Sequence, residues 1–457
     1  MIIVRRLARI PSHLRLGATV LGLALGLSSL LLASPAFALD YTLDLLLGGE
    51  ATDNINRVPD SQKRDGMESH IGSRIGLTHQ SEAINFEADY RLTYRDFKND
   101  RLETNDELNG SSELLWEVID NRLNWHVNHD ISEVLSNDLV PDTVDNKETR
   151  QILSTGPSYT ARLSAVDNII LSLDYTQLTQ GNAANESPID RSNIDSDRTQ
   201  ADIIWSHSLS GTSAIEIGYA NAETQFENNS PDFKYQQLFA GYNTELASGH
   251  YGFRLGTNRA ERSATSEEQN GVFTSINYNR HFSGNILSID IVRQLADSSI
   301  GLDRDIDGFN TNNFDEIAVV ERTRINIDYQ FQNLCRRCIA QLTYTYDDSD
   351  FENDELVIST DTTQDNEDNR ISATLTYNIN SRLSTRLLTS YLQTDFSAFG
   401  RKDKITEING QIDWKLSAKL ALNFYASYID RDTENTPLGN IDYTASTIGL
   451  SATYTIK

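Results

Sequence analysis

Residues 83–97 read AINFEADYRLTYRDF, and this stretch decides the fold. From Ile84 onward every second side chain is apolar, and the side chains between them are polar or charged. Because the side chains of a strand alternate between two faces, the stretch predicts a strand of about twelve residues, roughly 40 Å long. Strands in soluble sandwiches usually have about five or six residues, whereas a strand of a membrane barrel needs about 9–11. The length therefore favours a membrane barrel, with the apolar face against lipid and the charged face toward the lumen.

The first 38 residues have the pattern of a secretory signal peptide. Four arginines form a basic leader, residues 16–33 form an apolar run, and Ala36-Phe37-Ala38 is a small-x-small cleavage site. A signal anchor is the alternative. We expect cleavage of residues 1–38 and a mature chain of one domain, residues 39–457. This mature part has no second apolar run long enough for a helical span, so any membrane insertion must be by strands.

Composition narrows the classes of function. Without the leader the chain has 35 basic and 66 acidic residues, an excess of negative charge that argues against a nucleic-acid partner. A hydrophobic content of 38% is low for a packed core of this size but suits a protein whose apolar residues form an outer band. The two cysteines, Cys335 and Cys338, lie at an expected turn. We predict a disulfide that closes this turn, and zinc binding or redox chemistry is the alternative.

About twenty alternating segments follow one another, and the connections between them are short and long in turn. Tight turns are expected near residues 81–82, 120–121, 166–167, 210–211, 248–249, 283–284, 333–337, 380–381 and 417–418. Long polar connections are expected at 54–66, 98–106, 133–146, 180–195, 227–232, 264–269, 298–318, 351–368, 397–402 and 431–440. This pattern predicts an all-β protein, a transmembrane antiparallel up-and-down β-barrel of about 20 strands. Both termini would lie on the side of the short, periplasmic turns.

Charged residues on the polar faces of two distant segments are candidates for the lining of the lumen. They are Glu87, Asp89, Arg91 and Arg95 in the first segment, and Arg324 and Asp328 in residues 323–331. Two interpretations stay open, namely paired charges that fill a polar interior and a ring that selects a solute. Gly156-Pro157 interrupts another segment, and we expect a bulge or kink there because proline cannot donate to the ladder.

Two patterns could carry chemistry. His281 and Ser283 are spaced like the His-x-Ser pair of outer-membrane phospholipases and lipid A deacylases, but Gly284 follows at once and places them at a periplasmic turn. We therefore predict no catalytic residues and no enzyme. His126 and His129 differ by three and should point to opposite faces of a strand.

A calcium site is the second pattern. Asp303, Asp305 and Asp307, followed by Gly308, match the first half of a calcium loop. The twelfth position is Phe314 where a bidentate glutamate is expected. Ca²⁺ in this outside loop is thus the one cofactor that the sequence suggests, and a solvated acidic loop is the alternative.

Residues 52–59, TDNINRVP, with Gly76-Leu77 and Tyr90 further on, resemble the start of the outer-membrane proteins associated with PEP-CTERM and exosortase systems. Residues 156–159, GPSY, are similar to a Pro-Tyr element of the same group. The resemblance covers the first third of the chain and the barrel layout. It implies a barrel encoded among exopolysaccharide genes, with no defined catalytic residues.

Together these observations predict a secreted, outer-membrane, porin-like barrel, surrounded by outer-membrane lipids. Its expected role is that of an accessory conduit or assembly component for exopolysaccharide secretion, with exopolysaccharide or the export machinery as partner. A surface structural or adhesion barrel with a closed lumen is the alternative, and an outer-membrane hydrolase is a third.

Overall fold

A computed structural model of the chain describes residues 39–98, 104–135, 141–180, 195–226, 232–263, 267–297, 319–350, 365–397, 400–435 and 441–456. The expected signal peptide, residues 1–38, lies outside these ranges. The described part contains twenty strands and two single-turn 3₁₀ helices, η1 (Asp60–Gln62) and η2 (Val144–Asn146). No helix within it is long and apolar enough to cross a membrane.

The strands of the first half are β1 (Asp40–Thr52), β2 (Gly66–Gln80), β3 (Ile84–Phe97), β4 (Asn105–Ile119), β5 (Leu123–Leu135), β6 (Lys147–Arg162), β7 (Asp167–Gln180), β8 (Ser196–Ser208), β9 (Ser213–Phe226) and β10 (Phe233–Leu246). Those of the second half are β11 (Gly249–Arg262), β12 (Glu267–Phe282), β13 (Asn285–Asp297), β14 (Val319–Phe331), β15 (Cys338–Asp350), β16 (Asn366–Asn378), β17 (Leu383–Phe396), β18 (Arg401–Lys415), β19 (Leu420–Glu434) and β20 (Tyr443–Thr455). Most are 13 to 15 residues long, more than the about 9–11 residues that a tilted membrane strand requires, so each is long enough to cross the bilayer.

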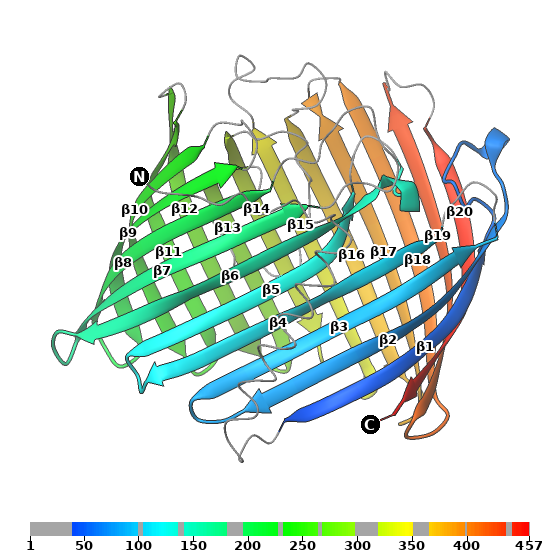
Figure 1. The fold of residues 1–457 in the computed structure, drawn as a ribbon, viewed down its shortest axis with the longest axis horizontal. Coiled ribbons are helices and arrows are strands. Elements are labelled where there is room, and N and C mark those ends of the chain that lie inside the picture. The colour runs from blue at the N-terminus through cyan, green and yellow to red at the C-terminus, as the bar shows by residue number, and fades with distance from the viewer. Residues whose placement is uncertain are drawn as a thin grey trace, which may run out of the picture.

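Each strand pairs antiparallel with the next, and β1 also pairs with β20, from Asp44↔Thr455 to Thr52↔Thr447. In Figure 1 the blue β1 accordingly lies beside the red β20 at the right of the barrel. The sheet is closed, and the predicted fold class and strand number are confirmed. All nine predicted tight turns fall on the short connections between strands, and the long connections occupy the opposite rim.

The outer face of the barrel is apolar. Along β16, Ile371, Leu375 and Tyr377 are exposed, and the side chains between them are less so. The same holds at the closing strand, where Ile448 is 66% exposed although it is a large aliphatic residue. Such exposure of large apolar side chains on one face of most strands is what a lipid-facing surface requires.

The interruption at Gly156-Pro157 differs from the expectation of a bulge. The β6–β7 ladder skips these two residues, but the pairs Thr155↔Tyr175 and Ser158↔Ser172 keep one register, so no residue is inserted. Proline removes one donor, and a Cβ on Gly156 would overlap the backbone of β7, so the two strands approach closely there without a shift. A register shift is found instead in β4–β5, between Glu117 and Ile119.

The connection between β1 and β2 covers the seam where the barrel closes. Asn54 is 1% exposed, and its amide donates to the carbonyls of Val58 (2.7 Å) and Thr444 (2.9 Å) while it accepts from the amide of Val58 (3.1 Å). Asp60 and Lys63 bind the hydroxyl of Thr444. Residues 52–59, which carry the family resemblance, thus tie the first strand to the last.

Candidate functional site: the inner wall of the barrel

The inner wall is formed by the side chains that alternate with the exposed apolar ones. On β3, Leu92 and Tyr94 belong to the outer face, so the odd-numbered positions face the lumen. The residues predicted to line the lumen from this strand lie at these positions: Glu87, Asp89, Arg91 and Arg95. The same alternation places Arg324 and Asp328 on the inner face of β14, because Ile325 and Ile327 pair with the outer-face residues Tyr346 and Tyr344.

Ion pairs join the inner faces of β2, β3 and β4. Arg74 donates to both carboxylate oxygens of Asp89, with Nε–Oδ1 at 2.8 Å. Nearer the outer rim, the guanidinium of Arg95 lies between Glu68 (Nε–Oε1, 3.6 Å) and Glu107.

The same wall continues across the seam. The hydroxyl of Tyr425 on β19 donates to Glu50 on β1, and its ring lies over Gly449 on β20, where a Cβ would overlap it. Two glutamates of this rim, Glu68 and Glu107, thus share Arg95, and His70 lies 3.5 Å from Glu68. A third, Glu50, accepts from Tyr425. This part of the outer mouth is acidic.

Two other groups of the inner wall have the reverse arrangement, one on β14 and β15, across the lumen from β3, and one on β18 and β19, beside the seam. Asp347 on β15 is 2% exposed and binds two arginines of β14, Arg322 (2.6 Å) and Arg324 (2.8 Å). Asp403 on β18 likewise binds Arg401 and Arg431, each at 2.6 Å. In both groups one carboxylate accepts from two guanidiniums, so arginines outnumber aspartates in each group. Arg401 also lies over the ring of Phe396, 5.1 Å from its centroid.

The six predicted lumen residues do not form one ring. Four belong to β3 and two to β14, and these strands lie on opposite sides of the barrel because nine strand steps separate them one way and eleven the other. Their partners were missed by sequence reasoning: Arg74, Glu68, Glu107 and Asp347. The signal for them was the register of the hairpins, since Arg324 pairs directly with Asp347 across the β14–β15 ladder.

Part of the wall bends inward. β12 pairs with β11 along its whole length, from Glu267 to Arg280, but its pairing with β13 ends at Thr274↔Arg293. Beyond Arg293, β13 stays paired only with β14, up to Asp297↔Val319. The outer end of β13 therefore separates from β12, while β14 stays paired with β15 up to Glu321↔Asp350.

The end of the β13–β14 hairpin packs against the inner face of its neighbours. Leu295 is 0% exposed and lies in a cluster with inner-face residues of β9, β10 and β11, against which Val319 also packs. The residues of this cluster are Ala222, Phe226, Phe233, Tyr235 and Ala260. Gly271 makes the approach possible, because a Cβ there would lie only 2.8 Å from Cγ of Leu295. The described part of the hairpin thus occupies space inside the lumen.

The remaining predicted sites have different outcomes. Cys335 and Cys338 form a disulfide across the β14–β15 turn, as predicted. Asp303, Asp305 and Asp307 lie outside the described residues, so the calcium site stays a prediction. Among the described residues no three His, Cys, Asp or Glu side chains form a group that could hold a metal ion.

The histidine pairs also have a place in the structure. His281 is the penultimate residue of β12, and Ser283 lies in the β12–β13 turn, where its φ is 49°. His126 binds Asp174 on the inner face at 2.8 Å, whereas His129 lies on the outer face, 2.7 Å from the hydroxyl of Tyr90. The two histidines of β5 thus point to opposite faces, as their spacing predicts.

A closed sheet with an apolar outer face and an ion-paired inner face defines the class of transmembrane β-barrels of the outer-membrane type.

No family model and no curated protein sequence matches the chain. Solved structures with a similar fold include the siderophore receptor PirA from Pseudomonas aeruginosa, with 11% identity, coverage of 90% of this chain and 80% of that chain, and a TM-score of 0.44. The FrpB iron transporter from Neisseria meningitidis (F5-1 variant) has 10% identity, 91% and 82% coverage, and a TM-score of 0.48. OmpT, an outer membrane protein of Vibrio cholerae, has 13% identity, 93% and 99% coverage, and a TM-score of 0.34. Similarity at this level is not evidence for the fold, which is shown by the pairing of the strands.

Proposed function

We propose that this protein is a porin-like conduit of the bacterial outer membrane that serves exopolysaccharide secretion, either as an accessory channel or as an assembly component. The observation that carries the conduit is the charge separation across the outer mouth. On β2 and β4, Glu68 and Glu107 share Arg95, and across the lumen, on β14 and β15, Arg322 and Arg324 share Asp347. A barrel that only filled its interior would not need a glutamate-rich and an arginine-rich group on facing walls.

Opposite charges on facing walls create a field across the lumen. Such a field orients polar solutes and makes water-filled passage selective for charge and dipole. The link to exopolysaccharide comes from the resemblance of residues 52–59 to the PEP-CTERM-associated barrels. A hydroxyl-rich polymer is a solute that the hydrogen-bonding groups of such a wall suit.

Single-channel recording in planar bilayers tests the conduit. The purified barrel should conduct, and neutral oligosaccharides added to one side should cause brief closures. The cation-to-anion permeability ratio should fall in Glu50→Gln, which keeps the hydrogen bond with Tyr425 but removes one charge of the acidic wall. Glu82→Gln, in the β2–β3 turn, is the control and should leave the ratio unchanged. Silent bilayers would refute an open conduit.

The inward hairpin favours a second candidate, a surface structural barrel whose lumen is closed. Leu295→Asp places a charge in the apolar cluster and should release the hairpin from the wall. If the conduit proposal is right, the unmodified protein conducts and the variant changes the size of the current. If the closed barrel is right, only Leu295→Asp conducts.

We propose no enzymatic activity. His281 and Ser283 lie at the β12–β13 turn, and a hydrolase that used them would need its substrate at the periplasmic rim. Lipid hydrolysis that Ser283→Ala abolishes would overturn this part of the proposal.

A further inference from the structure

A groove lies on the outer face of the barrel at the closing seam. It has a volume of about 500 Å³ and is lined by residues of four neighbouring strands or their ends, among them Ala51, Met67, Lys98 and Ile448. Ala51 pairs with Ile448 on β20 and with Met67 on β2, and the amide of Lys98 donates to the carbonyl of Met67. The groove therefore crosses β20, β1, β2 and the end of β3.

A small residue at the last outward position of β1 makes the groove. Ala51 lines it, between Ile448 on β20 and Met67 on β2. Ile448 and Met67 stand out from the wall, with 66% and 52% of their surface exposed. Gly49, the preceding outward residue of β1, continues the stretch of low side-chain bulk. Neighbouring outward positions are about 6–7 Å apart along a strand, which corresponds to part of an acyl chain.

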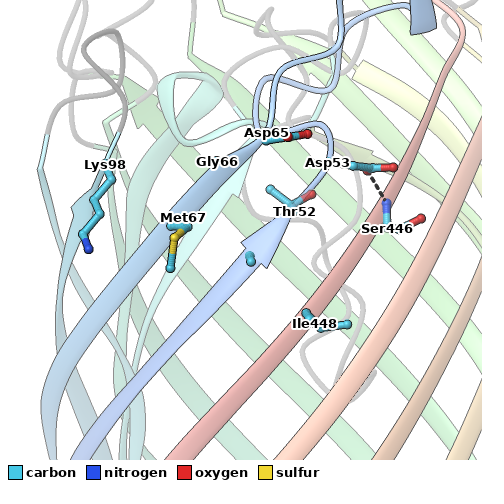
Figure 2. A pocket seen from close by; sticks show the side chains of 9 residues that line it. Thr52, Asp53, Asp65, Gly66, Met67, Lys98, Ser446 and Ile448 are labelled. Atoms are coloured by element: carbon cyan, nitrogen blue, oxygen red, sulfur yellow. Dashed lines mark hydrogen bonds between the residues drawn. The ribbon is translucent and has the colours of Figure 1, made fainter.

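The upper end of the groove is charged. Figure 2 shows Asp65 and Asp53 above, Met67 and Lys98 on one side, and Ile448 on the other. One oxygen of Asp53 accepts the amide of Ser446 at 2.7 Å, which fixes the carboxylate at the rim. Lys98 and Asp65 are both exposed. An apolar floor beneath two carboxylates and one ammonium matches the boundary between hydrocarbon and headgroups.

We propose that this groove binds one membrane lipid whose headgroup contains a phosphate and an amine, of the phosphoethanolamine type. An acyl chain lies over Gly49 and Ala51, between Met67 and Ile448. The phosphate binds the ammonium group of Lys98, and the amine binds the carboxylates of Asp53 and Asp65. A lipid seated here holds the first, second and last strands together from outside.

Native mass spectrometry with defined lipids tests the site. The barrel is exchanged into detergent with dioleoyl phosphatidylethanolamine or dioleoyl phosphatidylglycerol, and retained lipid is counted after activation. We expect one retained phosphatidylethanolamine per barrel, its loss in Ala51→Leu, and a loss of preference over phosphatidylglycerol in Asp65→Lys, which replaces a carboxylate that binds the amine. Ala240→Leu, at an exposed alanine on the outer face of β10, is the matched control and should retain the lipid.

The possible results separate a site from the lipid that surrounds any barrel. Equal retention by the unmodified protein, Ala51→Leu and Ala240→Leu would overturn the proposal, because only non-specific lipid would then be bound. Retention that Asp65→Lys leaves equally selective would overturn the headgroup assignment. Each variant is first shown to be folded by its faster migration on gels before boiling, so that failure to fold is not mistaken for failure to bind.

Discussion

The alternation of single side chains decides which groups meet lipid and which meet water. Leu375 and Thr374 are adjacent on β16, yet the first lies on the exposed apolar face and the second on the inner face. This assignment followed from the sequence alone, because a period of two has only two possible phases and one of them would place every charge in lipid. What a period of two does not contain is the identity of each partner, such as Asp347 for Arg324.

Arginine substitution on the two faces should have unequal cost. We expect Leu375→Arg to lower the free energy of unfolding by about 2–4 kcal/mol if the residue lies near the bilayer midplane, since the guanidinium would have to enter hydrocarbon. Thr374→Arg should be tolerated because its side chain enters the lumen. Denaturant titration of the barrel refolded into vesicles measures both, and equal losses would show that the faces are misassigned.

The carboxylate of Asp403 holds two buried guanidiniums, and it should therefore be costly to remove. Arg401 and Arg431 are 1% and 4% exposed, and in Asp403→Asn both would stay charged and lose the carboxylate that they share. We expect a loss of about 3–5 kcal/mol, as for other buried pairs that lose one partner. Asp395→Asn, which breaks a more exposed pair with Lys402 at 3.1 Å, should cost about 0–1 kcal/mol in the same titration. Similar values for the two variants would contradict the burial of the Asp403 group.

Hairpins and connections show where sequence reasoning reached its limit. Turn dipeptides such as Asn380-Ser381 placed all nine short connections, because hairpin turns need particular residues. The inward bend of β13 had no such signal. Leu295 continues the apolar alternation of its strand and reads as another lipid-facing residue, and only its contacts with β9, β10 and β11 reveal that it lies inside. The two-residue alternation of apolar and polar side chains does not predict contacts between strands that are not neighbours in the sheet.

The β1–β2 connection should stabilise the pairing of β1 with β20 at the seam. In Asn54→Ala the carbonyls of Val58 and Thr444 and the amide of Val58 lose their partner, and we expect a loss of about 1–3 kcal/mol. Hydrogen exchange should rise at β1 and β20 and stay unchanged at β10. Asn56→Ala in the same connection is the control. Protection of the seam that survives Asn54→Ala would show that the ladder alone closes the barrel.

Acid should loosen the same connection. The hydrogen bond from Lys63, together with that from the amide of Thr444, lowers the pKa of Asp60 below its ordinary value of 3.8. A lowered pKa in the folded state stabilises the connection above about pH 4, and this contribution is lost as the pH falls through the lowered value. Hydrogen exchange of residues 53–65, corrected for intrinsic rates, should therefore increase below pH 4. Asp60→Asn should show the increased exchange at neutral pH, and a pH-independent pattern in the unmodified protein would contradict this role.

Closure of the sheet gives the twenty strands an outer surface, an inner surface and one enclosed lumen. Strand number and closure could be predicted because every hairpin is local and the first and last strands have no other partners. The charge separation across the outer mouth could not, because it depends on which strands face each other across the lumen. It arises from residues as distant in sequence as Glu68 and Asp347, which lie on strands that face each other across the lumen.

Single-cysteine labelling along β3 tests the central claim, that one face of each strand meets lipid and the other a water-filled lumen. Each residue from Phe86 to Leu92 is replaced by cysteine in turn, and intact outer membranes are treated with a membrane-impermeant maleimide. The native cysteines are joined in a disulfide and do not react. We predict labelling at positions 87, 89 and 91 and none at 86, 88, 90 and 92. Labelling that does not alternate, or that alternates in the opposite phase, would contradict the barrel described here.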